Sequence, residues 1–215
     1  MDAEKHTEKE KLFAALGKTV AELTTQFDRI TADRKEVLNT LTQFVSARVA
    51  TGQTASLNFI CTHNSRRSHI AQLWGQAAAH YYGVSPVACY SGGTEATAFN
   101  PRAVQAMRKA GFDIREEAAG ANPVYAVKFS NEADAVKTFS KKFDDAFNPS
   151  KDFAAIMTCS HADENCPFVA GASQRIAITY DDPKDFDGTP LEDSKYNERV
   201  LQIGREILFA FSRVK

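Results

Sequence analysis

The chain has 215 residues, of which 43% are hydrophobic and 25% are charged. These fractions are typical of a globular protein and exclude a disordered chain or a low-complexity scaffold. Lys and Arg total 26 and Asp and Glu total 27, so the net charge of -1 provides no general positive field for nucleic acid or an anionic membrane. The charged residues 1–11 precede no apolar signal segment, and no run approaches about 18 apolar residues. We therefore expect a soluble, cytoplasmic protein.

Apolar residues recur at helical spacing over residues 5–50, which predicts two amphipathic helices. Thr31 or Asp33 can cap the second helix, and Gly52 is placed to end it. The short join predicts an antiparallel helical hairpin over residues 1–52. We expect its apolar stripes to serve packing or a homodimer, because they carry no pair of groups suited to catalysis.

After a polar link, short apolar runs alternate with helical patterns, which is typical of an α/β sheet with crossover helices. Strands are predicted at residues 57–61, 87–91, 154–158 and 175–179, and helices at 68–82, 100–110 and 194–214. Pro101 suits the first turn of the middle helix and Gly111 its end. The pattern predicts a four-stranded parallel sheet flanked by helices, in a catalytic domain over residues 56–215.

Residues 116–151 are less regular and form a predicted insertion in this domain. Residues 124–129 alternate between apolar and polar and predict a strand. A helical spacing connects four later residues, Val136, Phe139, Phe143 and Phe147. We expect this extra strand and helix to cover one edge of the sheet.

The first predicted strand ends at Cys61 and runs into a polar loop before a helix. Five residues separate Cys61 from Arg67, and a loop of this length can curl around a tetrahedral oxyanion. The expected oxyanion-binding residues are Thr62, His63, Asn64, Ser65, Arg66 and Arg67. Arg67 can present a planar fork to two oxygens, Ser68 can bond the sulfur of Cys61, and the positive field favours the Cys61 thiolate. The alternative is a buried strand-end cysteine beside surface arginines.

This loop, with Tyr90-Ser-Gly-Gly-Thr-Glu95 and the run 100–107, resembles the low-molecular-weight protein tyrosine phosphatase family and its relatives, the thioredoxin-coupled arsenate reductases. The resemblance covers roughly residues 56–115 and 153–214, and it implies an active loop at the carboxyl edge of the first strand. His63 stands where many members have Gly, and Arg66 is a second arginine in the loop. Either difference could alter the preferred oxyanion or add a cation beside Cys61.

Tyr180-Asp-Asp-Pro183 follows the last predicted strand. An Asp-Pro pair usually forms a turn. The resemblance implies that Asp182 is a general acid that protonates the leaving oxygen as Cys61 displaces it. Asp181 is the alternative acid.

Cys159 and Cys166 lie in the polar segment Met157-Thr-Cys-Ser-His-Ala-Asp-Glu-Asn-Cys-Pro167. By their spacing alone they could be core residues, metal ligands or a redox pair. His161 and Cys89 would complete a zinc site, although the segment lacks a Cys-x2-Cys knuckle and Cys89 is expected to be a small buried apolar residue. The resemblance implies a redox pair and no metal or organic cofactor.

An arsenate reductase of this type would use three cysteines in turn. The resemblance implies that Cys61 attacks arsenate, that Cys159 then attacks Cys61, and that Cys166 moves the disulfide outward to a thioredoxin-like reductant. In the alternative, a phosphatase, water hydrolyses a phospho-cysteine at Cys61 formed from a phosphate ester such as phosphotyrosine. A third possibility is an oxyanion-binding or redox-sensing module whose hairpin docks a partner.

Overall fold

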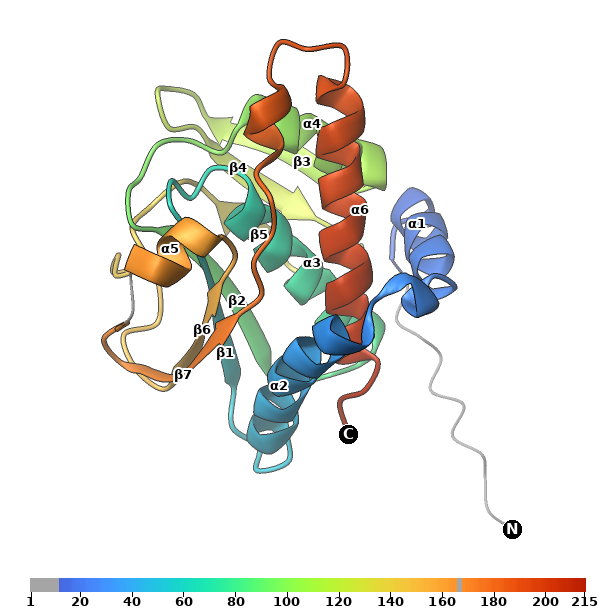
Figure 1. The fold of residues 1–215 in the computed structure, drawn as a ribbon, viewed down its shortest axis with the longest axis vertical. Coiled ribbons are helices and arrows are strands. Elements are labelled where there is room, and N and C mark those ends of the chain that lie inside the picture. Colours follow the sequence, from blue (N-terminus) through green and yellow to red (C-terminus); the bar gives the residue numbers. More distant parts are fainter. Residues whose placement is uncertain (1–11, 166–167) are drawn as a thin grey trace.

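The computed structural model describes residues 12–165 and 168–215, and a parallel sheet runs through its centre (Figure 1). Its order is β2-β1-β6-β7. The strands are β1 (Ala55–Cys61), β2 (Val87–Gly93), β6 (Phe153–Met157) and β7 (Ala172–Ala177). The central strand β1 is buried along almost its whole length, as a strand covered on both faces must be. The four predicted strands and their parallel pairing are confirmed.

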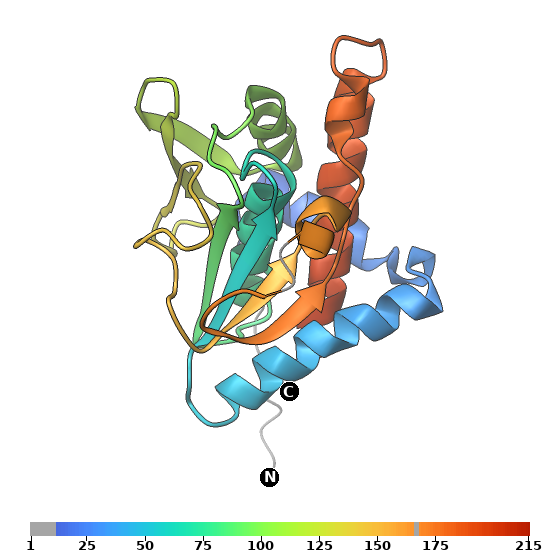
Figure 2. The ribbon, with the colours of Figure 1, turned by 60° about the vertical axis from the view of Figure 1, so that its left-hand side comes forward.

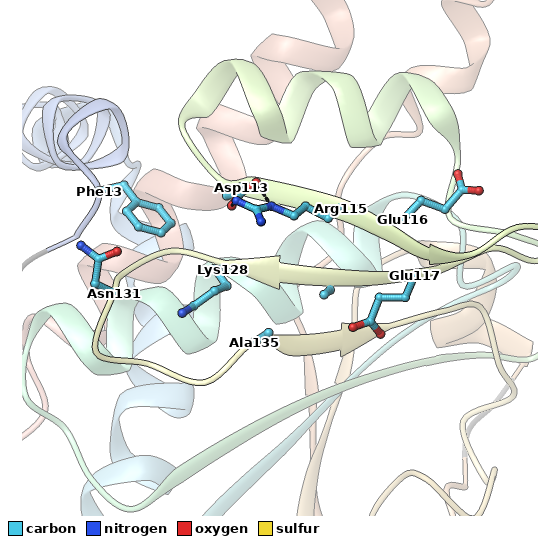
Figure 3. A pocket seen from close by; sticks show the side chains of 9 residues that line it. Phe13, Asp113, Arg115, Glu116, Glu117, Lys128, Asn131 and Ala135 are labelled. Atoms are coloured by element: carbon cyan, nitrogen blue, oxygen red, sulfur yellow. Dashed lines mark hydrogen bonds and ion pairs between the residues drawn. The ribbon is translucent and has the colours of Figure 1, made fainter.

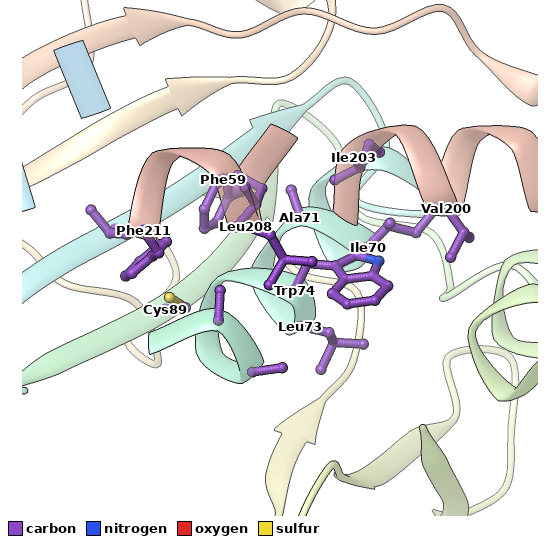
Figure 4. Packing of buried hydrophobic residues seen from close by; sticks show 14 of the residues in the cluster. Phe59, Ile70, Ala71, Leu73, Trp74, Cys89, Val200, Ile203, Leu208 and Phe211 are labelled. Atoms are coloured by element: carbon purple, nitrogen blue, oxygen red, sulfur yellow. The ribbon is translucent and has the colours of Figure 1, made fainter. Parts of the chain in front are cut away.

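Helices α3 (Arg67–Tyr81), α4 (Pro101–Ala110) and α6 (Glu192–Phe211) confirm the three predicted helices, and α3 covers one face of the sheet. α3 packs on β1 and β2, α6 packs on α3, and α4 packs on α6. Trp74 of α3 is fully buried against α6 beside Val200, Ile203 and Leu208 (Figure 4). A Cβ atom at Gly204 would lie 2.6 Å from the Trp74 ring, so this helix contact requires glycine.

The predicted N-terminal helices are present as α1 (Ala14–Thr24) and α2 (Ala32–Val49), joined through the short helix η1 (Phe27–Arg29). Thr31 caps α2, accepting the Arg34 backbone N–H at 3.3 Å. The two helices do not pack on each other as an antiparallel hairpin. Each packs against α6 instead, and α2 also crosses β1 and β7 (Figures 1 and 2).

Apolar side chains of the N-terminal helices belong to the same core as the sheet. They are Leu16, Val20, Leu23, Ile30, Leu38, Leu41, Phe44 and Val45. The stripes that suggested a homodimer are therefore buried within this chain. That removes the physical reason for expecting a second copy to bind them.

The insertion forms a three-stranded antiparallel sheet of β3 (Asp113–Ala118), β4 (Val124–Lys128) and β5 (Val136–Thr138). The predicted strand is confirmed, but the helix predicted from Val136 to Phe147 is wrong. After β5 the chain runs as a loop along the end of edge strand β2, where Gly93 donates to the Lys141 carbonyl and accepts from Phe143, both at 2.9 Å. The spaced aromatics meet across this loop, since the rings of Phe139 and Phe147 lie edge to face at 5.3 Å.

Two short elements complete the edge where the parallel strands end. α5 (Ser160–Asn165) follows β6, and η2 (Pro183–Phe186) follows β7. α5 covers the second face of the sheet, where Ala162 packs in one cluster with Cys61 and Cys159. In the described ranges, no helix combines the length and the apolar character that crossing a bilayer requires.

Candidate active site

The Cys61 loop connects the end of β1 to the start of α3, as predicted. Its carbonyls face the surrounding protein. Those of Cys61, Thr62, His63 and Ser65 accept hydrogen bonds of 2.8–3.1 Å from Thr94, Glu95, Thr97, Asn100 and Ser140. Among residues 12–165 and 168–215, none accepts a hydrogen bond from the backbone N–H groups of residues 62–67. Those N–H groups are therefore available to an oxyanion.

Asn64 carries the left-handed backbone of the loop, with φ at 42°. Asparagine tolerates this region better than most residues, so the loop takes up the left-handed conformation at a suitable residue and not at His63. The Asn64 side chain accepts the Lys141 backbone N–H at 2.9 Å. Directly beneath, a Cβ atom at Gly93 would lie 2.6 Å from the Asn64 nitrogen. Gly93, the last residue of β2, therefore lets the loop pack closely on that strand.

Cys61 lies at the base of the loop and is only 3% exposed. Its sulfur is 3.1 Å from Ser68 Oγ. Ser68 in turn accepts a hydrogen bond of 2.9 Å from Asn64 Nδ2, which directs the Ser68 proton toward the sulfur. The charge of Arg66 also acts on Cys61. A hydroxyl group and a positive charge therefore lie beside the sulfur of Cys61.

Asp182 lies against both loop arginines. Arg66 Nε donates to Asp182 Oδ1 and Arg67 Nη2 to Oδ2, each at 2.7 Å. Arg67 also donates to the Tyr180 carbonyl at 2.9 Å. Burial alone would raise the pKa of Asp182, but the charges and hydrogen bonds of Arg67 and Arg66 outweigh it and hold that pKa below its usual range. Asp181 points outward with its side chain 94% exposed, so the structure brings Asp182 to the loop and leaves Asp181 outside.

Cys159 follows β6 and lies on the other side of the loop. It is 1% exposed and shares a buried cluster with Cys61. Thr62 Oγ1 lies 3.5 Å from the sulfur of Cys159 and 3.2 Å from His161 Nδ1. Cys166 lies outside the described residues.

Cys89 is separate from these groups. Its sulfur packs beneath α3, 2.9 Å from where a Cβ at Gly75 would lie, and burial raises the pKa of its thiol. Cys89 belongs to the main core, and Cys159 to the cluster on the other face of the sheet. Cys89 is therefore placed as the predicted core residue and not as a zinc ligand beside Cys159.

Two further buried polar residues lie next to the loop and were missed in the sequence. His69 is fully buried, with Nδ1 3.1 Å from Ser91 Oγ, and burial together with the charge of Lys141 keeps its pKa well below the usual value. Lys141 is 3% exposed, and burial lowers the pKa of its amine to about 8. No local signal marks either residue, because α3 is buried almost throughout and Lys141 lies in the wrongly predicted helix.

A separate hollow of about 600 Å³ lies on the three-stranded sheet (Figure 3). Its lining residues are Phe13, Asp113, Arg115, Glu116, Glu117, Ala126, Lys128, Asn131 and Ala135. The lining mixes both signs of charge and contains none of the groups that surround Cys61. The candidate active site is therefore the loop.

Comparison with known proteins identifies the family of this chain. Residues 56–166 match the model of the low-molecular-weight phosphotyrosine protein phosphatases. The chain belongs to this family. The resemblance seen in the sequence is confirmed, and the chain is an enzyme of that family.

The curated relatives carry the name arsenate reductase. The chain is 32% identical over 150 residues to the arsenate reductase of Halalkalibacterium halodurans, covering 69% of this chain and 89% of that protein. It is 32% identical over 128 residues to the arsenate reductase of Brevibacillus brevis, covering 60% and 76% of the two chains. A solved low-molecular-weight phosphotyrosine phosphatase from Vibrio cholerae O395 aligns with a TM-score of 0.49 and 12% identity over 72% of this chain and 93% of that one.

Proposed function

We propose that this protein is an arsenate reductase that uses Cys61 as its nucleophile. The observation that carries this proposal is the position of Cys159. Its sulfur lies buried beside the loop, joined to Thr62 at 3.5 Å, where a phosphatase would need no second thiol. The curated relatives named arsenate reductase support the reductase over the phosphatase.

The first step joins arsenate to Cys61. The N–H groups of residues 62–67 hold the oxyanion, and Arg67 turns from the Tyr180 carbonyl toward two of its oxygens. With Arg67 withdrawn, Asp182 keeps Arg66 as its cationic partner but loses the second positive charge. The pKa of Asp182 then rises toward the ordinary value of a carboxyl group. Asp182 then protonates the departing hydroxyl, and water leaves as the S–As bond forms.

The second step reduces arsenic. The Cys159 thiolate attacks the sulfur of Cys61, the S–As bond breaks, and its electron pair stays on arsenic, which leaves as arsenite. A Cys61–Cys159 disulfide remains. Cys166 then attacks Cys159 and passes the disulfide to the pair Cys159–Cys166, where a thioredoxin-like protein reduces it. A reducing, cytoplasmic location suits this cycle, because free thiols persist there.

Two serine variants test the proposal. Cys159→Ser and Cys166→Ser are each expected to abolish multiple-turnover arsenate reduction with thioredoxin while retaining hydrolysis of para-nitrophenyl phosphate. Hydrolysis requires only Cys61, Arg67 and Asp182. Cys166→Ser should also complete one turnover and then stall as a Cys61–Cys159 disulfide, seen as a mass loss of about two hydrogens.

The second candidate is the phosphatase itself, which the family match and the Cys61–Arg67–Asp182 arrangement favour. It predicts hydrolysis of phosphotyrosine peptides by the wild-type protein and no arsenate turnover with thioredoxin. That pair of results would refute the reductase.

A further inference from the structure

Cys159 must lose a proton before it can attack Cys61, yet its side chain has no direct access to solvent. The residue is 1% exposed. The Ala162 backbone N–H donates to its sulfur at 3.3 Å, and Thr62 Oγ1 lies 3.5 Å away. Of these two neighbours only the hydroxyl can accept a proton and pass another on.

The other side of Thr62 contacts a base. His161 Nδ1 lies 3.2 Å from Thr62 Oγ1, and the imidazole is exposed to solvent. The three groups form a row from the buried sulfur through the hydroxyl to an exposed ring nitrogen. Helix α5 fixes this row, because Cys159 precedes its first residue and Asp163 within it bonds Arg175 of β7.

Resting on the proposed reductase function, we propose that His161 is the proton acceptor for the resolving thiol Cys159, acting through the hydroxyl of Thr62. With His161 neutral and its proton on Nε2, Nδ1 takes the Thr62 hydroxyl proton as that oxygen takes the proton of Cys159. The thiolate then attacks Cys61. His161 is thus a positioning and relay residue that never touches arsenic.

The atoms and charges of the step balance. The Cys61–arsenate adduct, the Cys159 thiol and one further proton give the Cys61–Cys159 disulfide and arsenous acid. The two electrons that reduce arsenic are those of the broken S–As bond. One proton taken up by the arsenic oxygens comes from Cys159 by way of His161, and the other comes from solvent.

A single-turnover experiment in full-length protein tests the relay. The parent is the Cys166→Ser variant, whose turnover stops at the Cys61–Cys159 disulfide, and rapid quenching with mass spectrometry gives the rate of that step. In this parent, His161→Ala and Thr62→Val are expected to slow disulfide formation by about 100-fold or more, within the usual range for general acid–base catalysis. Thr62→Ser should restore the rate, and added imidazole should rescue His161→Ala but not Thr62→Val. Glu164→Ala, an exposed change on the same helix, is the matched control and should equal the parent.

Two further measurements separate this inference from a structural effect and from the proposed function. Hydrolysis of para-nitrophenyl phosphate, which does not use Cys159, should be unchanged in His161→Ala, and an equal loss there would overturn the relay. If the parent forms no disulfide with arsenate, the proposed function has failed. Hydrogen peroxide then still tests the relay, because it oxidises Cys61 to a sulfenic acid that Cys159 resolves with loss of water. If His161→Ala forms the disulfide at the rate of the Cys166→Ser parent with either oxidant, the role of His161 is refuted.

Discussion

Asp182 accepts hydrogen bonds from Arg66 and Arg67 at once, and this arrangement has a chemical cost for any step that needs an acid. A carboxyl held between two guanidinium groups gives up its proton at lower pH than usual. In the proposed first step Arg67 leaves this pair for the oxyanion, and Arg66 remains with Asp182. Arg66 therefore limits how well Asp182 can protonate a leaving group, whether a phenolate or the hydroxide of arsenate.

Replacing Arg66 should widen the pH range of phosphatase activity. In Arg66→Met, Asp182 loses one cation and two hydrogen bonds, so its pKa rises. Activity that requires protonated Asp182 is lost as pH rises through that pKa. We expect this falling limb of kcat/KM for para-nitrophenyl phosphate to move to higher pH by about one unit or more. Asp181→Asn, at the exposed neighbouring position, should leave the limb in place, and an unmoved limb in Arg66→Met would contradict the role of Arg66.

Lys141 is a buried cation that the fold must accommodate. Its pKa falls from 10.5 to about 8, so between these values the unfolded chain binds the proton more readily than the folded one. The stability of the wild type should therefore rise with pH across this window and be flat below it. Lys141→Met should raise the free energy of unfolding at pH 7 by about 1–3 kcal/mol and remove that slope.

Urea unfolding at pH 7 and at about pH 9.5 measures both effects of Lys141→Met. The backbone bonds of residue 141 to Asn64 and Gly93 do not depend on its side chain and should survive. Lys142→Met, at the exposed neighbouring position, is the control. Equal stability of the two variants at pH 7 would show that the Lys141 amine has little energetic cost.

At the scale of elements, the sequence predicted those helices and strands whose form is set by their own residues. The strands of the main sheet are short apolar runs, and Pro101 in the first turn and Gly111 at the end mark α4 as predicted. The predicted helix over 136–147 failed because distant backbone groups of Gly93 decide that segment. The nearness of Thr62 to His161 was equally invisible, since it depends on β1 and β6 being adjacent in the sheet.

A partly buried ion pair links helix α2 to α6 and to the segment that precedes Asp182. Arg34 donates to Glu206 of α6 at 2.8 Å and to the Thr179 carbonyl at 3.0 Å, and it lies over the Tyr180 ring. The two residues it holds come just before the Asp181-Asp182 pair. Helix α2 thereby holds the segment between β7 and the candidate acid Asp182, and both α2 and Asp182 lie outside the matched residues 56–166.

Removing one partner of this ion pair should strongly lower the free energy of unfolding. Arg34→Met leaves Glu206, 4% exposed, without its cation, and we expect a loss of about 3–5 kcal/mol in the free energy of unfolding. The double variant Arg34→Met/Glu206→Leu removes both charges and should recover most of that loss. Urea unfolding of the three proteins decides the question, and a double variant no more stable than the single one would contradict the ion-pair explanation.

At the scale of the whole molecule, the structure has one main core that runs from α1 to α6. The division into a segment 1–52 and a catalytic domain 56–215 remains a proposal. The buried residues of α1 and α2 fill the space beside α6, and the main-chain nitrogen of Leu16 comes within 2.3 Å of where a Cβ at Gly111 would lie. Such close packing is typical of one folding unit.

Removing residues 1–52 should therefore prevent cooperative folding. The deletion takes away eight buried apolar side chains, each contributing about 1.5–3 kcal/mol, and this loss is comparable to or larger than the 5–15 kcal/mol by which a domain of this size is usually stable. Because an unfolded product gives little information, Leu38→Ala and Leu41→Ala in the full chain provide a graded test. Each should lower the free energy of unfolding by about 2–5 kcal/mol, whereas the exposed change Glu36→Ala should have little effect. A truncated protein that unfolds cooperatively and still hydrolyses para-nitrophenyl phosphate would show instead that α1 and α2 are separable from the catalytic domain.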